Sequence, residues 1–139
     1  MTKTHKHHHN SSVRLFLLIV SMLTGATCFA ASLPDLIPTA ISYDSTSGNF
    51  TSVVRNQGQV STPTGVIIGV AYNVDGVKCT WGAVPGPLAA GASVTIGTQG
   101  GACVIQVGTH TITVVADDAN RITESNKNNN TFSRTITLP

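Results

Sequence analysis

Residues 66–81 read VIIGVAYNVDGVKCTW, an alternating apolar run followed by a tight turn. Large apolar or aromatic side chains occupy every second position, as in a strand that buries one face: Val66, Ile68, Val70, Tyr72 and Val74. Asp75-Gly76 follows at once. Asp-Gly between strand residues is typical of a two-residue hairpin, because both turn positions need a positive φ. We therefore expect a β-hairpin here, with Tyr72 in the core.

Short runs of the same kind lie on both sides of this hairpin, each bounded by turn residues. Strands are expected over 36–43, 50–55, 66–74, 77–83, 93–96, 109–117 and 131–138. Only 10% of the residues are charged, and no stretch has the composition of a helix. The sequence thus predicts an all-β domain over 31–139, a single antiparallel β-sandwich of about seven strands. A β-barrel is the alternative.

The first 30 residues have the composition of a secretory signal peptide. A basic start precedes an apolar run over 15–23, and small residues follow up to Ala30. Cleavage is expected after Ala30, with Ala31 as the alternative. The apolar run is too short for a bilayer, which needs roughly 20 residues. We expect a secreted or periplasmic protein that does not span a membrane.

The charge of the chain also changes once residues 1–30 are set aside. The whole chain has eight Lys and Arg residues and six Asp and Glu residues. Three basic residues lie in the first 30, so five remain against six acidic ones, a net charge of −1. This balance offers no basic patch, and we expect no nucleic-acid partner.

Cys79 and Cys103 are the two cysteines of 31–139. In an exported chain, two cysteines predict one disulfide. It would close a loop of about 25 residues and stabilise the fold by about 3.5 kcal/mol through chain entropy. Two buried free thiols are the alternative.

A set of short segments runs in order along almost the whole of residues 34–138. They cover 34–37, 54–58, 74–76, 88–93, 108–111, 117–120 and 124–130. Together these segments resemble the CARDB domain, a bacterial cell-adhesion-related module. The resemblance implies an immunoglobulin-like fold of seven strands, extracellular use and no catalysis. Some variants with a Trp after the hairpin are similar to sugar-binding modules.

The leading functional hypothesis is a secreted, non-catalytic binding or adhesion module for an extracellular polysaccharide or a surface protein. The alternative is a structural spacer or assembly subunit with no small ligand. An enzyme is the least favoured class, because no nucleophile motif occurs. His110, the sole histidine of 31–139, shares the parity of Ile112 and is expected to be structural.

Trp81 is the only tryptophan and follows the hairpin closely. An exposed indole would offer a flat apolar face on which a sugar ring can stack. Trp81 also shares the parity of Val77 and Cys79, and this favours a core or edge position against the disulfide. Trp81 is therefore a candidate ligand-binding residue with a structural alternative.

The polar connection after residue 116 carries many side-chain oxygens. Oxygen ligands of this kind suit Ca²⁺, although the spacing is not that of an EF-hand. Asn and Asp side chains also cap backbone groups in tight connections, and this capping role is the favoured interpretation. The calcium candidates are Asp117, Asp118, Asn120 and Glu124.

Overall fold

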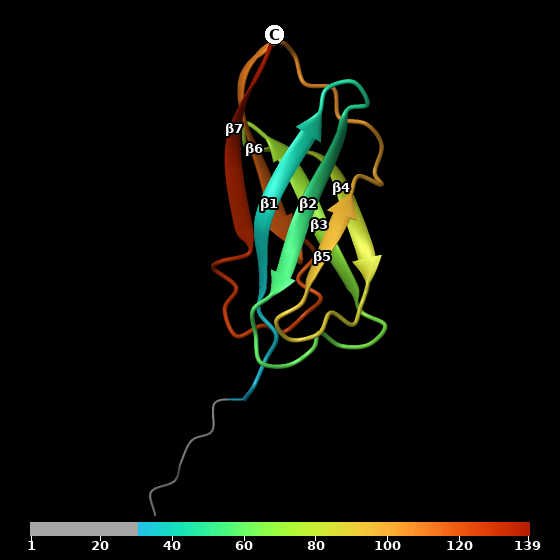
Figure 1. Ribbon diagram of the computed structural model, residues 1–139, viewed down its shortest axis with the longest axis vertical. Coiled ribbons are helices and arrows are strands. Elements are labelled where there is room, and N and C mark those ends of the chain that lie inside the picture. Colours follow the sequence, from blue (N-terminus) through green and yellow to red (C-terminus); the bar gives the residue numbers. More distant parts are fainter. Residues whose placement is uncertain (1–30) are drawn as a thin grey trace, which may run out of the picture.

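This computed structural model describes residues 31–139 of the chain. These residues contain seven strands and no helix (Figure 1). The signal-peptide prediction lies outside these residues. The strands are β1 (Leu36–Asp44), β2 (Asn49–Asn56), β3 (Ile67–Val74), β4 (Val77–Pro85), β5 (Ser93–Gly97), β6 (Gly108–Ala116) and β7 (Thr131–Leu138). Between residues 31 and 139 there is no helix that could cross a bilayer.

The strands form two antiparallel sheets that face each other (Figure 1). One sheet has the order β1-β2-β5 and the other the order β4-β3-β6-β7. Two separate sheets make a sandwich, so the predicted fold class is confirmed and the barrel alternative is excluded.

The Asp75-Gly76 hairpin is present as predicted. Both residues have positive φ, 49° and 84°, and Val74 pairs with Val77 across the turn. The Asp75 carboxylate also fixes the hairpin to β6. It accepts a hydrogen bond from the Thr111 backbone N–H at 2.8 Å and lies 2.7 Å from His110 Nδ1.

The core lies between the sheets, and Tyr72 is at its centre. Tyr72 is fully buried and stacks on Phe50 with ring centroids 4.9 Å apart, which confirms its predicted core position. Its hydroxyl donates to the Ile96 carbonyl at 2.6 Å and lies 2.9 Å from Ser52 Oγ. Burial raises the pKa of the Tyr72 hydroxyl. One β3 side chain thus joins both sheets through packing and hydrogen bonds.

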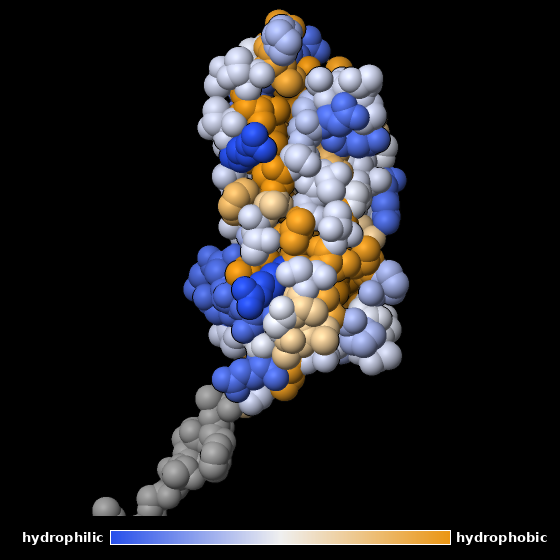
Figure 2. Space-filling view, viewed as in Figure 1, coloured by the Kyte–Doolittle hydropathy of each residue, from blue (hydrophilic) through white to orange (hydrophobic). Residues whose placement is uncertain are grey.

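The connection between β6 and β7 is long and polar. Figure 2 shows hydrophilic side chains gathered low on the visible face, where this connection lies in Figure 1. It carries the predicted calcium ligands and one wall of the groove described next.

Candidate functional site

Trp81 lies on the outer face of β4, with 44% of its surface exposed. A bulge in β4 precedes it: Tyr72 pairs with Thr80 but Asn73 pairs with Lys78, which leaves Cys79 as the extra residue. Thr80 and Gly82 are the residues that point inward. Trp81 is therefore not in the core; it lies on β4, which is an edge strand of its sheet.

Gly82 explains why no large side chain of β4 points inward at this level. A Cβ atom added to Gly82 would lie 2.2 Å from the Gly97 carbonyl oxygen of β5. The two sheets approach so closely at this edge that an indole has no room inside. The bulge also shifts the alternation along β4, so Lys78, and not Val77 or Cys79, lines the outer groove together with Trp81. The shared face predicted for Val77, Cys79 and Trp81 is therefore wrong as well.

An open groove of about 300 Å³ lies beside Trp81, and we call it the Trp81 groove. Its lining residues are Ile67, Gly69, Lys78, Trp81, Gly82, Ala83, Asp118 and Arg121. β3 and β4 supply six of them, and the connection after β6 supplies the other two.

Gly69 lets charged side chains lie across β3. A Cβ atom there would be 2.5 Å from Asp118 Oδ1 and 2.9 Å from Arg121 NH1. Gly69, Lys78 and Arg121 were not predicted as site residues. A glycine inside a strand often marks a close approach of another group, so Gly69 was the one available signal.

The polar wall of the groove is a small ion cluster. Lys78 Nζ lies 3.1 Å from Asp118 Oδ2, and Arg121 NH1 lies 4.0 Å from Asp118 Oδ1. The Lys78 and Arg121 side chains are about half exposed, whereas the Asp118 side chain is mostly covered. The groove therefore combines an exposed indole with two accessible cations.

The segment after β5 holds Trp81 in place. The backbone N–H groups of Gln99 and Gly100 both donate to the Trp81 carbonyl, at 2.8 and 3.1 Å. Gly100 also packs on the indole, since a Cβ atom there would lie 2.3 Å from Trp81 Cδ1. The segment covers one side of the indole and leaves the rest for the groove.

The predicted disulfide is present. Cys79 and Cys103 are bonded, with Cα atoms 5.8 Å apart, so the free-thiol alternative does not hold. Cys103 is buried and Cys79 is exposed. The bond anchors the segment that contacts Trp81 to the strand that carries Trp81.

Asp117 caps the start of the connection after β6. Its buried carboxylate accepts hydrogen bonds from the backbone N–H groups of Arg121 and Ile122, at 2.8 and 3.1 Å. The Lys127 ammonium also donates to it.

Glu124 joins the same connection to β1. Its buried carboxylate accepts from the Leu36 backbone N–H, from Asn130 Nδ2 at 2.8 Å and from Lys127 Nζ at 2.8 Å. Burial by itself would lower the pKa of Lys127, but hydrogen bonds from the ammonium to Asp117 and Glu124 raise it. Lys127 is thus held in its charged form.

The predicted calcium ligands are not brought to one centre. Lys127 Nζ lies between Asp117 and Glu124, where a bound cation would have to be. Asp118 turns away to Lys78, and Asn120 is exposed and donates its backbone N–H to the Asp117 carbonyl at 2.8 Å. Residues 31–139 contain no group of three or more His, Cys, Asp or Glu side chains arranged for a metal. Backbone capping, the favoured interpretation, is what the carboxylates of Asp117 and Glu124 do.

His110 contributes to the hairpin rather than to a catalytic arrangement. Its Nδ1 lies 2.7 Å from Asp75 Oδ2, and its Nε2 lies 3.1 Å from the Gln106 carbonyl oxygen. The hydrogen bond with Asp75 raises the pKa of His110 and lowers the pKa of Asp75.

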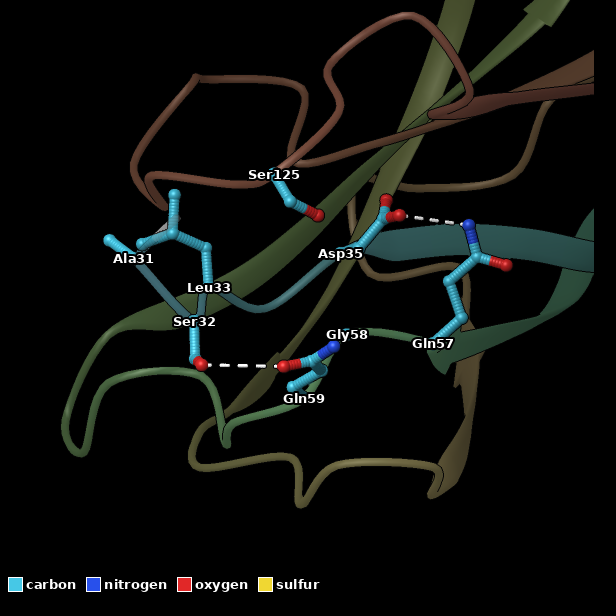
Figure 3. Close-up of a pocket in the computed structure, with 8 residues that line it drawn as sticks. All are labelled: Ala31, Ser32, Leu33, Asp35, Gln57, Gly58, Gln59 and Ser125. Carbon is cyan, nitrogen blue, oxygen red and sulfur yellow. Dashed lines mark hydrogen bonds between the residues drawn. The ribbon is translucent and has the colours of Figure 1, made fainter. Parts of the chain in front are cut away.

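A second hollow, of about 380 Å³, lies beside the start of β1 (Figure 3). Its polar side chains largely pair with one another: Ser32 Oγ donates to Gln59 Oε1 at 3.3 Å, and Gln57 Nε2 donates to Asp35 Oδ2 at 2.8 Å. No aromatic or cationic side chain is among its lining residues. It lacks the recognition groups that the Trp81 groove has.

Comparison with solved structures shows the same fold in other proteins. One is a domain of a putative cell surface protein from Methanosarcina acetivorans: TM-score 0.63, 22% identity, covering 77% of this chain and 93% of that one. Another is a CARDB domain from Pyrococcus furiosus, solved in complex with di-metal ions: TM-score 0.56, 17% identity, covering 79% and 97%. No curated protein matches the chain.

A comparison with protein families gives the assignment. Residues 33–134 match the sequence model of CARDB, and this span includes nearly all of the sandwich. The resemblance inferred from the ordered segments is thereby confirmed, and the chain belongs to the CARDB family of adhesion-related domains.

Proposed function

We propose that the protein is an extracellular, non-catalytic binding module that holds a polysaccharide chain in the Trp81 groove. The observation that carries this proposal is the exposed indole of Trp81 beside accessible polar side chains. The face of a pyranose ring is lined with C–H groups, so it can lie flat on an indole while its hydroxyl groups reach neighbouring side chains. Binding sites commonly combine an apolar contact surface with a few placed polar groups.

Several features favour this use of Trp81 over a scattered surface residue. Single exposed apolar side chains are common and carry no meaning by themselves. Trp81, however, shares its groove with Ile67, which is 40% exposed, and is braced by Gly100 and the disulfide. An aromatic side chain that is already fixed loses little conformational freedom on binding.

Three observations support an extracellular location. Residues 1–30 have the composition of a secretory signal peptide, and the disulfide is a bond that persists in oxidising compartments. The Methanosarcina relative is also described as a putative cell surface protein.

The test is binding of the purified protein to a panel of neutral and charged polysaccharides by affinity electrophoresis. The Trp81→Ala variant should bind at least about tenfold more weakly, because truncating a central aromatic contact costs about 2 kcal/mol or more. Val77→Ala is the matched control: Val77 is 71% exposed on the same strand but does not line the groove, so its affinity should not change.

Two results would count against the proposal. Equal affinities of the wild type and Trp81→Ala would place the polysaccharide elsewhere on the surface. Absence of binding to every polysaccharide would favour the spacer or assembly role instead.

A further inference from the structure

The Trp81 groove presents an excess of hydrogen-bond donors. Arg121 carries five N–H donors, and its 4.0 Å approach to Asp118 is too long to be a hydrogen bond. Lys78 carries three donors and uses one on Asp118 at 3.1 Å. The indole of Trp81 adds no acceptor, and the edge of the ring that carries Nε1 lies against Gly100.

Acceptors are scarce in the same groove. Asp118 is the one carboxylate among the lining residues, and its side chain is 16% exposed. One of its oxygens faces Lys78, and the other lies nearest Arg121. A neutral sugar offers hydroxyl groups that donate as well as accept, and in this groove the O–H groups of such a ligand would find few side-chain acceptors.

The local charge of the groove also favours an anionic ligand. Two of the five Lys and Arg residues of 31–139 line the groove together with one carboxylate, a local net charge of +1 on a part of the chain whose net charge is −1. Lys127 is engaged with Asp117 and Glu124. Arg55 and Arg134 are exposed on β2 and β7 and do not line the groove. The groove thus brings two cations together with one carboxylate, and its net positive charge attracts anions.

We propose that the ligand of the Trp81 groove is an anionic polysaccharide, whose acidic group binds Arg121 and Lys78 while its sugar ring stacks on Trp81. A planar guanidinium presents two parallel N–H groups to a carboxylate or a sulfate, a stronger contact than a hydrogen bond between neutral groups. This inference rests on the proposed function, because it names the chemical class that the same groove takes.

Matched pairs of polysaccharides separate the effect of the acidic group from the effect of the sugar chain. Polygalacturonate is compared with its methyl ester, in which the carboxylates are esterified, and dextran sulfate is compared with dextran. Dissociation constants are measured by calorimetry at low and at physiological ionic strength. At least one acidic polymer should bind about tenfold or more tightly than its neutral counterpart, and added salt should weaken it.

Variants then assign the effect to the groove. Arg121→Gln and Lys78→Gln should each reduce the preference for the acidic polymer, whereas Trp81→Ala should weaken binding of that polymer as a whole. Arg134→Gln is the matched control, because Arg134 is exposed on β7 and does not line the groove. Thermal unfolding of each variant verifies that it is folded.

The outcomes distinguish the two proposals. Selective binding of polygalacturonate or of dextran sulfate identifies a carboxylate or a sulfate as the acidic group, and supports the inference in either case. Equal binding of acidic and neutral forms, lost in Trp81→Ala, overturns the anionic ligand but keeps the polysaccharide site. Polyglutamate binding that needs Arg121 but not Trp81 would overturn the inference in favour of an acidic peptide.

Discussion

At the scale of single residues, Lys127 stabilises the long connection between β6 and β7. Its ammonium is the cation that compensates two carboxylates, Asp117 and Glu124, whose side chains are fully covered. A buried carboxylate without a cation costs several kcal/mol. The connection is thus ordered around a side-chain charge that the chain itself supplies.

Lys127→Met tests this role. The variant keeps a long side chain but leaves two buried carboxylates without their cation. We expect the free energy of unfolding to fall by about 2–4 kcal/mol, toward the lower end of the cost of breaking a buried ion pair because solvent reaches Lys127. Denaturation in urea measures this change.

Lys78→Met is the control for Lys127→Met. Lys78 pairs with Asp118 at the surface, where such a pair contributes about 0–1 kcal/mol. Similar losses of stability in the two variants would show that Lys127 contributes no more to stability than a surface ion pair does, and would contradict its role as the cation of the two buried carboxylates.

The orientation of Trp81 could not be predicted from the sequence. Alternation says which side chains share a face only along a regular strand, and the bulge at Cys79 breaks it, so that Trp81 lines the groove with Lys78 and not with Val77. It cannot say which face meets the core when small and polar residues occupy both sides, as they do in β4. Here Gly82 lies so close to Gly97, 15 residues further along the chain, that only the face of β4 with Gly82 fits against the core, and Trp81 points outward.

At the scale of elements, the β5–β6 connection crosses between the sheets and also supports Trp81 from the side. Gln99 and Gly100 of this connection contact Trp81, and Cys103 anchors it to β4. Thr80 adds a further tie, because its hydroxyl donates to the Gly101 carbonyl at 2.8 Å.

The double variant Cys79→Ala/Cys103→Ala should loosen this element. We expect a loss of about 3 kcal/mol in the free energy of unfolding, from the entropy of the opened loop. We also expect stronger quenching of Trp81 fluorescence by acrylamide, because the Gly100 segment no longer stays against the indole. Unchanged quenching in a folded double variant would show that the hydrogen bonds hold the segment without the disulfide.

The strands were the most predictable elements. β3 and the Asp-Gly turn follow directly from period two and from the need for positive φ. The connection between β6 and β7 was not predictable beyond its polarity, because local sequence does not say whether an Asp caps the backbone, meets a lysine or faces a groove. Asp117 and Asp118 are neighbours in sequence and face different partners.

At the scale of the whole molecule, the Trp81 groove lies on the outer side of the sheet with the order β4-β3-β6-β7. The blue start of the described chain and the C-terminus lie at opposite ends of the long axis (Figure 1). The groove is formed by strands and a connection from distant parts of the sequence, so the fold brings Asp118 and Arg121 to Gly69 and Trp81. Its existence could therefore not be inferred from any one segment.

The central claim is that Trp81 is exposed and binds a polysaccharide, and its own fluorescence tests this most directly because it is the only tryptophan. The account predicts a red-shifted emission spectrum for the free protein, and a change in intensity or wavelength that saturates as an acidic polysaccharide is added. A blue-shifted spectrum that does not respond to any polysaccharide would contradict it, because Trp81 would then be buried and unavailable to a ligand.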